Sequence, residues 1–423
     1  MNGPGLRVAI VGSGVAGIAS AHMLQTRHEV TLIEKRPRLG GHTHTIAIES
    51  GPDAGIRVDT GFIVCNDKTY PNFHRFLKSL GVGVRYSDMS FGFWDERSGL
   101  QYAGTNLNGL FAQRTNLLRP RFLRMIREIV RFSKVALRDL EQGIIGSTTL
   151  GSYLREYGFG REFVRNYVLP MGAAIWSTPG GKMLNFPAQT FITFFRNHGL
   201  LSVKDRPRWQ TVVGGSDSYI DSFRKGFRGK IRAGESIETI KRAEDSVTIR
   251  FQDSHEQTFD RVVIATHADQ VLPLLEAPTE EERRIFGPWK YEANHVILHT
   301  DEKVLPPNKR AWASWNYTRE KNADDHRKLS MTYHMNRLQG LSAQSEYCVT
   351  LNRKAPVEDR KIIRSMRYMH PIYSPESIEA QSQLPGLNGK SNTFFAGSYH
   401  GYGFHEDAVT SAVRVAEHFE TGF

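Results

Sequence analysis

Cysteine is scarce in this sequence of 423 residues, and its scarcity excludes two classes of protein. The two cysteines, Cys65 and Cys348, lie far apart and form neither a CxxC pair nor a zinc-ligand spacing. A disulfide scaffold and a cysteine-rich metal site are therefore excluded, and this usage is typical of a reducing cytoplasm. The histidines and carboxylates also lack metal-ligand spacing, so we expect no metal.

Long apolar runs are missing as well. No stretch approaches the roughly 18 uninterrupted apolar residues that a membrane-spanning helix needs. The N-terminus has no basic segment followed by an apolar core and a cleavage site, because glycines interrupt its apolar stretch. We therefore expect a cytoplasmic protein that is soluble or bound peripherally to the inner face of the membrane.

Acidic residues are outnumbered, since 55 Lys and Arg face 44 Asp and Glu for a formal net charge of +11. Such an excess attracts nucleic acid, an acidic substrate or an anionic membrane surface. We expect no nucleic-acid partner, because the basic residues gather on one segment without the interleaved aromatics of a known binding module. The Gly-x-Ser-x-Gly elbow of a hydrolase is also absent.

The N-terminal stretch carries the strongest motif. An apolar run at 7–11 leads into Gly12-Ser13-Gly14-Val15-Ala16-Gly17 and then into small residues that suit a helix. This is the order of strand, phosphate-binding turn and helix that defines the dinucleotide fingerprint. Gly12 permits the tight turn, Gly14 lets the backbone approach a pyrophosphate, and Gly17 lets the helix pack on the strand. The helix N-terminus would hold the pyrophosphate.

A second strand, predicted at 29–34, ends in an acid at the expected place. Glu34 lies about 20 residues beyond the glycines, where the carboxylate of a dinucleotide-binding domain accepts hydrogen bonds from ribose hydroxyls. A basic residue there would instead suit a 2′-phosphate. Since no second Gly-x-Gly-x-x-Gly with a following acid occurs, we do not expect an NAD(P)H domain.

The next segment, 35–45, contains Gly40-Gly41-His42-Thr43. It resembles the second signature of the flavin-containing amine oxidase and phytoene desaturase superfamily, an acid followed by a basic residue and Gly-Gly-Arg. His42 stands where that family usually has Arg. Four further segments resemble signatures of the same superfamily and follow in its order: 57–64, 209–216, 261–267 and 392–408.

The last of these segments contains Ala396-Gly397-Ser398 and ends in His-Gly-Tyr-Gly-Phe-His-Glu-Asp. Ser398 replaces the acid that the superfamily usually has in this turn. The ending is similar to that of a bacterial branch associated with cyclopropane and methyl-branched fatty acid metabolism. A helix follows the turn, and the resemblance implies that its N-terminus points at the pyrimidine edge of a flavin, where it can stabilise negative charge.

The resemblance implies an α/β fold: a Rossmann-like FAD-binding domain of the GR2 type, interleaved with a mixed α+β substrate domain built on an antiparallel sheet. We expect the FAD-binding domain at 1–83, 205–268 and 385–423, and the substrate domain at 84–204 and 269–384 with a helical part at about 118–200. FAD would be bound non-covalently, because no cysteine lies near the Ala396-Gly397 turn. The residues implied to bind FAD are Gly12, Ser13, Gly14, Ala16, Gly17, Glu34, Lys35, Arg36, Gly40, Gly41, His42, Thr43, Gly61, Phe62, Ile237, Thr266, Gly397, Ser398, Phe404, His405 and Ala408.

Two stretches bear on the substrate. The segment 119–142 predicts a basic amphipathic helix, with arginines on one side and apolar residues that include Leu123 and Val130 on the other. Such a helix lies on an anionic membrane or packs its apolar stripe inward with a solvated basic face. The aromatic-rich segment 152–201 predicts either an apolar tunnel or an ordinary helical core.

We therefore predict an FAD-dependent oxidoreductase that desaturates or isomerises a long fatty acyl chain, lipid-bound or free, by hydride transfer to flavin N5. The nearest titratable residues to the implied flavin are His400, His405 and Glu406, each of which could instead be a helix cap or ring contact. The alternative is amine oxidation, which the presence of Phe394 in place of an expected Tyr disfavours. A second alternative is a non-catalytic protein that binds flavin and lipid.

Overall fold

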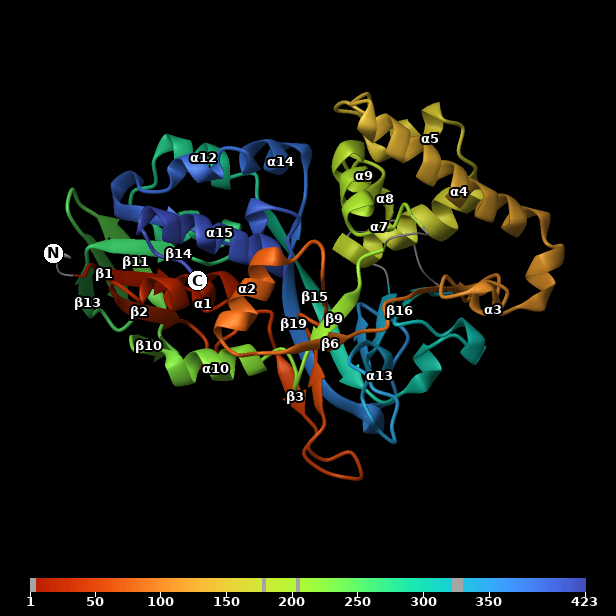
Figure 1. Cartoon of the computed structure of the whole chain (residues 1–423), viewed down its shortest axis with the longest axis horizontal. Helices are drawn as coiled ribbons and strands as arrows, with labels where there is room; N and C mark the ends of the chain where they lie inside the picture. The colour runs from red at the N-terminus through yellow and green to blue at the C-terminus, as the bar shows by residue number, and fades with distance from the viewer. Residues whose placement is uncertain (1–4, 177–179, 203–205, 322–329) are drawn as a thin grey trace.

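The computed structural model describes residues 5–176, 180–202, 206–321 and 330–423. Figure 1 shows two parts side by side, one that contains both chain ends and a parallel sheet, and one that contains a second sheet with a group of helices above it. The mixed α/β fold class expected from the sequence is confirmed. The expected boundary at 204 and 205 falls outside the described residues.

The first part is organised by a five-stranded sheet whose printed pairs are all parallel. Its strands are apolar and buried, as expected when both faces of a parallel sheet are covered. They come from three stretches that lie far apart in the chain. In order across the sheet they are β10 (Lys230–Ala233), β2 (Glu29–Glu34), β1 (Arg7–Val11), β14 (Arg261–Ile264) and β20 (Thr393–Phe395).

Helices cover one face of this sheet and a small antiparallel sheet covers the other, which gives three layers. The helices are α1 (Val15–Leu24), α2 (Pro71–Ser79), α10 (Ser218–Gly226) and α15 (His405–His418), of which α15 packs against α1 and α2. The small sheet is β11 (Ile237–Arg242), β12 (Val247–Phe251) and β13 (Glu256–Phe259).

The second part is built on a seven-stranded sheet. Its neighbours are antiparallel except for one pair, β16 with β7, which is parallel. The expected antiparallel sheet is therefore present with one parallel junction. The strand order is β19 (Ile362–Ile372), β15 (Lys290–His299), β18 (Cys348–Leu351), β17 (Ser330–His334), β16 (Trp315–Arg319), β7 (Phe91–Asp95) and β8 (Gln101–Ala103).

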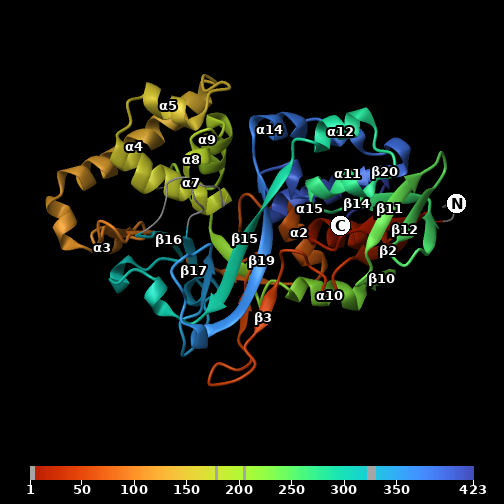
Figure 2. The ribbon, with the colours of Figure 1, turned by 180° about the vertical axis from the view of Figure 1, so that it is seen from behind.

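Helices lie above one end of this sheet, as Figures 1 and 2 both show. Aromatic side chains of the segment 152–201 pack on one another there: the Trp176 ring centroid is 4.7 Å from that of Phe186, and Phe191 stacks on Phe195 at 4.1 Å. These rings are core residues. The helices are α3 (Leu107–Leu110), α4 (Pro120–Glu141), α5 (Leu150–Glu156), α6 (Arg161–Phe163), the π-helical turn η2 (Val164–Val168), α7 (Leu169–Trp176), α8 (Gly180–Met183) and α9 (Ala188–Asn197).

Helix α4 is the amphipathic helix predicted at 119–142. It buries Phe122, Met125 and Phe132, so its apolar stripe packs inward. Leu123 and Val130, expected on that stripe, are instead 41% and 52% exposed. The sequence pattern overestimated the width of the buried face, because the neighbouring helices cover only the line that Phe122, Met125 and Phe132 share.

Two small sheets lie between the parts, and further short helices lie in one part or the other. The sheets are β3 (Thr45–Ala47) with β4 (Arg57–Asp59), and β5 (Cys65–Asn66) with β9 (Trp209–Val212) and β6 (Val84–Tyr86). The helices are α11 (Val271–Leu274), α12 (Glu280–Phe286), α13 (Met335–Leu338) and α14 (Pro375–Gln381). Among the described residues, no helix combines the length and the apolar character needed to cross a bilayer.

Candidate active site

The turn between β1 and α1 has the geometry predicted for a phosphate-binding turn. Gly12 has a φ of +101°, which favours glycine, and a methyl group there would lie 2.6 Å from the Ala265 carbonyl oxygen. A methyl group on Gly17 would lie 1.9 Å from the Gly12 oxygen, so the helix can approach the turn only because this residue is glycine. A methyl group on Gly14 would meet no atom within 4 Å.

The space at Gly14 lies at the N-terminus of α1, a helix of 10 residues that has no side-chain cap and no acidic residue in its first turn. Its first N–H groups, which include that of Ala16, are therefore available to an anion. Thr266, at the end of β14, lies on the other side of the turn, with its backbone nitrogen 3.4 Å from a methyl group built on Gly12.

Glu34 ends β2 beside this turn and is 9% exposed. Its carboxylate accepts hydrogen bonds from the Ser13 N–H at 2.9 Å, the Ser13 hydroxyl at 2.7 Å and the Arg36 N–H at 3.0 Å. A carboxylate has about four acceptor positions, so one remains for a ligand hydroxyl. The Glu34 carbonyl accepts from the Glu235 N–H at 3.1 Å, which brings the start of β11, and with it Ile237, to this edge. Lys35 and Arg36 are exposed beside it.

The second glycine pair lies against the first turn. Gly40 and Gly41 have φ values of +107° and +58°, and a methyl group on Gly41 would lie 3.1 Å from the Gly14 Cα. Arg38 holds this loop in shape by donating to the carbonyls of Gly41 at 2.8 Å and Thr43 at 2.6 Å. The sequence prediction did not include Arg38, although it is the basic residue nearest the glycine pair.

His42, which stands where the superfamily usually has Arg, is uncharged. Burial lowers the pKa of His42 to about 4, so the ring is neutral. Its Nε2–H donates to the Met369 carbonyl at 3.0 Å, and its ring lies 5.4–5.6 Å from those of Tyr368, His267 and His370. The half-buried Arg38 is therefore the cation of this loop.

Strand β19 reaches this cluster from the other part of the molecule. The Tyr368 hydroxyl lies 2.9 Å from His44 Nδ1 and 2.9 Å from the Thr60 hydroxyl. His267 stacks on Tyr291 with ring centroids 4.6 Å apart, and burial lowers the pKa of His267 to about 3. No role was predicted for these residues, because only the fold brings them to the cofactor loop.

The terminal helix meets the glycine loop through His405, its first residue. His405 Nε2 lies 3.1 Å from the Thr43 hydroxyl, which is 2.5 Å from the Tyr219 hydroxyl. The His405 ring stacks on Phe62 at 3.6 Å, and burial lowers its pKa to about 3. Gly61 precedes Phe62, and a methyl group there would lie 1.9 Å from the His42 oxygen. The predicted residues of segments 40–45, 57–64 and 392–408 therefore meet.

The next two residues of α15 stabilise helix N-termini. The Glu406 carboxylate accepts from the N–H groups of Asn72 at 3.1 Å and Phe73 at 2.9 Å, which belong to the first turn of α2. Asp407 accepts from the Phe404 N–H at 2.8 Å, and burial raises its pKa to about 7. Both oxygens of Glu406 are thus engaged in a cap, which argues against a role as a free catalytic base.

His400, the third candidate, lies in the turn between β20 and α15. Neither of its ring nitrogens has a hydrogen-bond partner among the described residues. Burial lowers the pKa of His400 to about 3. The same turn is fixed by the Gly397 N–H, which donates to the Ser411 hydroxyl at 2.9 Å, and by the Ser398 carbonyl, which accepts from the Gly401 N–H at 3.1 Å. Ala408 is buried one turn into α15.

Phe394 is far from the position assumed for it. It lies on β20 and packs on Phe419 at 4.7 Å and on His418 at 5.5 Å, near the C-terminal end of α15. The argument that Phe394 replaces a substrate-facing Tyr is therefore wrong, because the side chain points into the core of the first part.

A group of aromatic rings, which we call the wall of rings, lies at the N-terminal end of α15 and consists of Phe194, His198, Trp209, Tyr402 and Phe404. Phe404 lies 5.2 Å from Phe194 of α9, and Phe194 lies 5.7 Å from Tyr402 and stacks on His198 at 3.8 Å. His198 in turn lies 5.9 Å from Trp209 of β9. Burial lowers the pKa of His198 to about 4, so the rings of this wall are uncharged.

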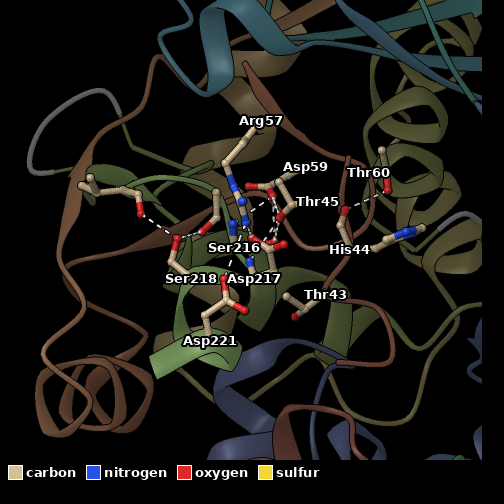
Figure 3. A network of polar contacts seen from close by, with 12 residues as sticks. Thr43, His44, Thr45, Arg57, Asp59, Thr60, Ser216, Asp217, Ser218 and Asp221 are labelled. Carbon is tan, nitrogen blue, oxygen red and sulfur yellow. Dashed lines mark hydrogen bonds and ion pairs between the residues drawn. The ribbon is translucent and has the colours of Figure 1, made fainter. Parts of the chain in front are cut away.

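Asp59 is the centre of a polar network that includes Thr45 and Ser216, as Figure 3 shows. This buried carboxylate accepts from the Thr45 hydroxyl at 2.6 Å, the Ser216 N–H and hydroxyl at 2.8 Å each, and the Gln339 amide at 3.0 Å. Arg57 pairs with Asp217 in the same network. The residues come from β3, β4, the turn after β9 and the segment after α13, so Asp59 ties four chain segments together.

These contacts fit an elongated dinucleotide such as FAD. The line runs from Glu34 through Gly14 and Gly41 to Thr43 and His405, and the space at Gly14 is the one that a Cβ would fill. Among the described residues, no group of three or more His, Cys, Asp or Glu side chains could hold a metal ion.

Comparison with known proteins agrees with this geometry. The family model for flavin containing amine oxidoreductases matches residues 15–356. An L-amino-acid oxidase of Siganus canaliculatus is 23% identical over 273 residues, which are 63% of this chain and 49% of that protein. A zeta-carotene desaturase of Zea mays is 38% identical over 83 residues, 19% of this chain and 13% of that protein. The chain thus spans about half, or less, of these relatives.

Among solved structures, a CLA-producing fatty acid isomerase from P. acnes superposes with a TM-score of 0.69 at 16% identity and covers 99% of both chains. At this identity the likeness shows a shared fold.

Proposed function

This chain belongs to the flavin containing amine oxidoreductase family, an FAD-dependent oxidoreductase family, and from that premise we propose that it desaturates or isomerises a long fatty acyl chain. Bound FAD supplies the redox chemistry, since it accepts a hydride from carbon. The chain supplies a binding surface for the cofactor, an apolar surface for the substrate and control over protons.

The wall of rings at Phe194, His198 and Phe404 is the observation that carries this proposal. Its contacts are between aromatic rings, and its histidine is neutral at physiological pH. Aromatic and apolar linings bind hydrocarbon by removing it from water, at about 25 cal/mol for each Å² buried. A cationic amine would need a carboxylate, and Asp407, close by in α15, accepts a backbone hydrogen bond as a cap.

The roles of the chain's residues follow from their contacts. The N-terminus of α1 and Arg38 would hold the negative charge of the cofactor, and Glu34 would bind its ribose. His405, Thr43 and Tyr219 form a hydrogen-bonded row in which a proton at His405 Nε2 can be held or passed on. Its low pKa makes His405 a weak base, so we assign it first to orientation.

The experiment is anaerobic mixing of the purified holoprotein with an oleoyl phospholipid and with free oleic acid, followed by the flavin absorbance spectrum and mass spectrometry of the lipid. We expect an acyl lipid to change the spectrum. A product lighter by two hydrogens indicates desaturation, and one of unchanged mass with a moved double bond indicates isomerisation. Extraction of a co-purifying lipid would identify the substrate class directly.

Amine oxidation is the second candidate, favoured by the likeness to an L-amino-acid oxidase and by the rings themselves, which can also surround a neutral amine. Putrescine and L-amino acids are therefore added in parallel reactions. Bleaching of the flavin by an amine, with acyl lipids inert, would overturn the acyl proposal. If no compound reduces the flavin while lipid still binds, the protein is a non-catalytic flavin and lipid binder.

We also propose that the enzyme works at an anionic membrane surface. Its net charge of +11 and the exposed arginines of α4 support this location, since juxtamembrane basic residues are attracted to anionic lipid.

A further inference from the structure

A basic cavity lies at the N-terminal end of α4, in the second part of the molecule. Its volume is about 950 Å³, and none of the residues implied to bind FAD line it. Seven arginines and two carboxylates do. In Figures 1 and 2, α4 lies at the end of the molecule away from α1 and β1, so this cavity is remote from the glycine turn.

The two carboxylates are already engaged. Asp95 pairs with Arg319 at the base of the cavity, at 3.2 Å, and each of these side chains is about one-tenth exposed at 11% and 10%. Glu162 accepts from the Asn166 amide at 2.9 Å. Asn166 also accepts from Arg319 at 3.0 Å, so the base of the cavity is a rigid polar network.

The arginines at the rim are not neutralised in this way. Arg121, Arg124 and Arg161 are exposed, and no ion pair or hydrogen bond of their side chains occurs in the part of the chain that the structure describes. Like charges around one cavity repel one another, and an anion that accepts from several guanidinium groups relieves the repulsion.

The backbone adds to this positive potential. Helix α4 has 22 residues, begins at Pro120 without a side-chain cap and has no acidic residue in its first turn. Pro120 and Arg121 line the cavity, so the positive end of the helix dipole faces it. The π-helical turn η2 contributes Arg165 and Asn166 to the opposite side.

The surface next to the cavity is apolar and exposed. Leu118, which lines the cavity, is 87% exposed. Leu117, beside it in the chain, and Leu123, in the first turn of α4, are 49% and 41% exposed. A free phosphate ion would not contact these leucines, whereas a bilayer has an anionic headgroup and an acyl layer next to one another.

We infer that this cavity binds the phosphate headgroup of an anionic phospholipid while Leu118 and its neighbours enter the acyl layer. The cavity would be the docking point through which the proposed enzyme reaches membrane-borne acyl chains. Only the role of the cavity in reaching acyl chains rests on the proposed function. Headgroup binding is a property of the cavity itself.

The test is co-sedimentation of the full-length holoprotein with vesicles of phosphatidylcholine alone or with about 30% phosphatidylglycerol, at low and high salt. We expect binding only with phosphatidylglycerol, and weaker binding at high salt. The triple substitution Arg121→Gln, Arg124→Gln, Arg161→Gln should weaken binding about a hundredfold, since each basic residue near an anionic surface contributes about a fivefold gain.

The matched control removes the same charge elsewhere: Arg224→Gln, Lys225→Gln, Lys230→Gln, exposed residues of α10 and β10 in the first part. This control should bind nearly as wild type. Equal loss in both triple variants would mean that net charge alone acts, and would overturn the inference. Flavin content and melting temperature report whether each variant is folded.

Leu118→Ser separates the two sources of phosphate. We expect this variant to bind the vesicles more weakly than the wild type. In a separate competition, inorganic phosphate and glycerol 3-phosphate should displace the wild-type protein from the vesicles only at high concentration. Unchanged vesicle binding of this variant, or displacement by phosphate at low concentration, would assign the cavity to a soluble anion and overturn the inference. Vesicle binding without turnover of any acyl lipid would leave the cavity assigned and refute the proposed function instead.

Discussion

Gly14→Ala tests the cofactor site because the space beside Gly14 is empty of protein atoms. A methyl group there meets nothing within 4 Å, and the φ of −63° is open to alanine. The substitution should therefore lower the free energy of unfolding of the apoprotein by only about 1 kcal/mol, the difference between glycine and alanine at an N-cap. The methyl group would nevertheless fill the place where a pyrophosphate approaches the N-terminus of α1.

The expected loss of affinity follows from the contacts that the methyl group prevents. One hydrogen bond to a charged group contributes about 1.5–3 kcal/mol, and the helix dipole adds about 0.3–1 kcal/mol. Loss of about 2 kcal/mol weakens FAD binding roughly thirtyfold, since about 1.4 kcal/mol corresponds to a factor of ten. Titration of the apoprotein with FAD, followed by quenching of flavin fluorescence, measures this change.

Gly17→Ala is the matched control, because its methyl group would collide with the Gly12 oxygen at 1.9 Å. We expect this variant to lose stability by about 1–3 kcal/mol even without FAD, as overpacked sites do. Urea unfolding of both apoproteins separates the two effects. A Gly14→Ala protein that binds FAD within about threefold of wild type would refute the reasoning.

Two further predictions concern single side chains. Glu406→Gln should lower the free energy of unfolding by about 1 kcal/mol, because the carboxylate caps α2. It should leave kcat nearly unchanged. A large fall in kcat with unchanged stability would make Glu406 a catalytic candidate again. His299 is fully buried and accepts a hydrogen bond from the Asp301 N–H at Nδ1. Burial lowers the pKa of His299 to about 4, so the ring stays neutral in the folded protein. In the unfolded chain the same ring gains a proton below about pH 6.5. The free energy of unfolding should therefore fall as the pH falls from 6.5 toward 4, by about 1.4 kcal/mol per pH unit from this group. His299→Asn should remove this pH dependence, which urea unfolding at pH 7 and pH 5 measures. An equal pH dependence in the wild type and the variant would contradict the prediction.

The cofactor half of the site could be predicted because its signals are local. The order of β1, the glycine turn, α1 and β2 is encoded within residues 7–34, and each glycine has a steric reason that a short segment reveals. The five segments that resemble the flavoenzyme superfamily also come together at the Gly40-Gly41 loop.

The rest depended on contacts between distant segments. Strand β19 mixes apolar and charged residues without a regular alternation and was not predicted, yet its Tyr368 contacts His44 and Thr60. Phe394 was misplaced because the direction of a side chain on β20 depends on the packing of α15. The pKa values of His42 and His405 depend on burial, which no local pattern reveals.

The order of strands in the parallel sheet has a consequence for how the protein is made. Strand β1, synthesised first, pairs with β14 at Arg261, and β14 pairs with β20 at Thr393. During translation the apolar faces of β1 and β2 therefore stay exposed until their partner strands emerge much later. His405, which joins the glycine loop, emerges after both of these strands. We expect cofactor loading to be a late event in biogenesis, and the nascent chain to depend on chaperones until then.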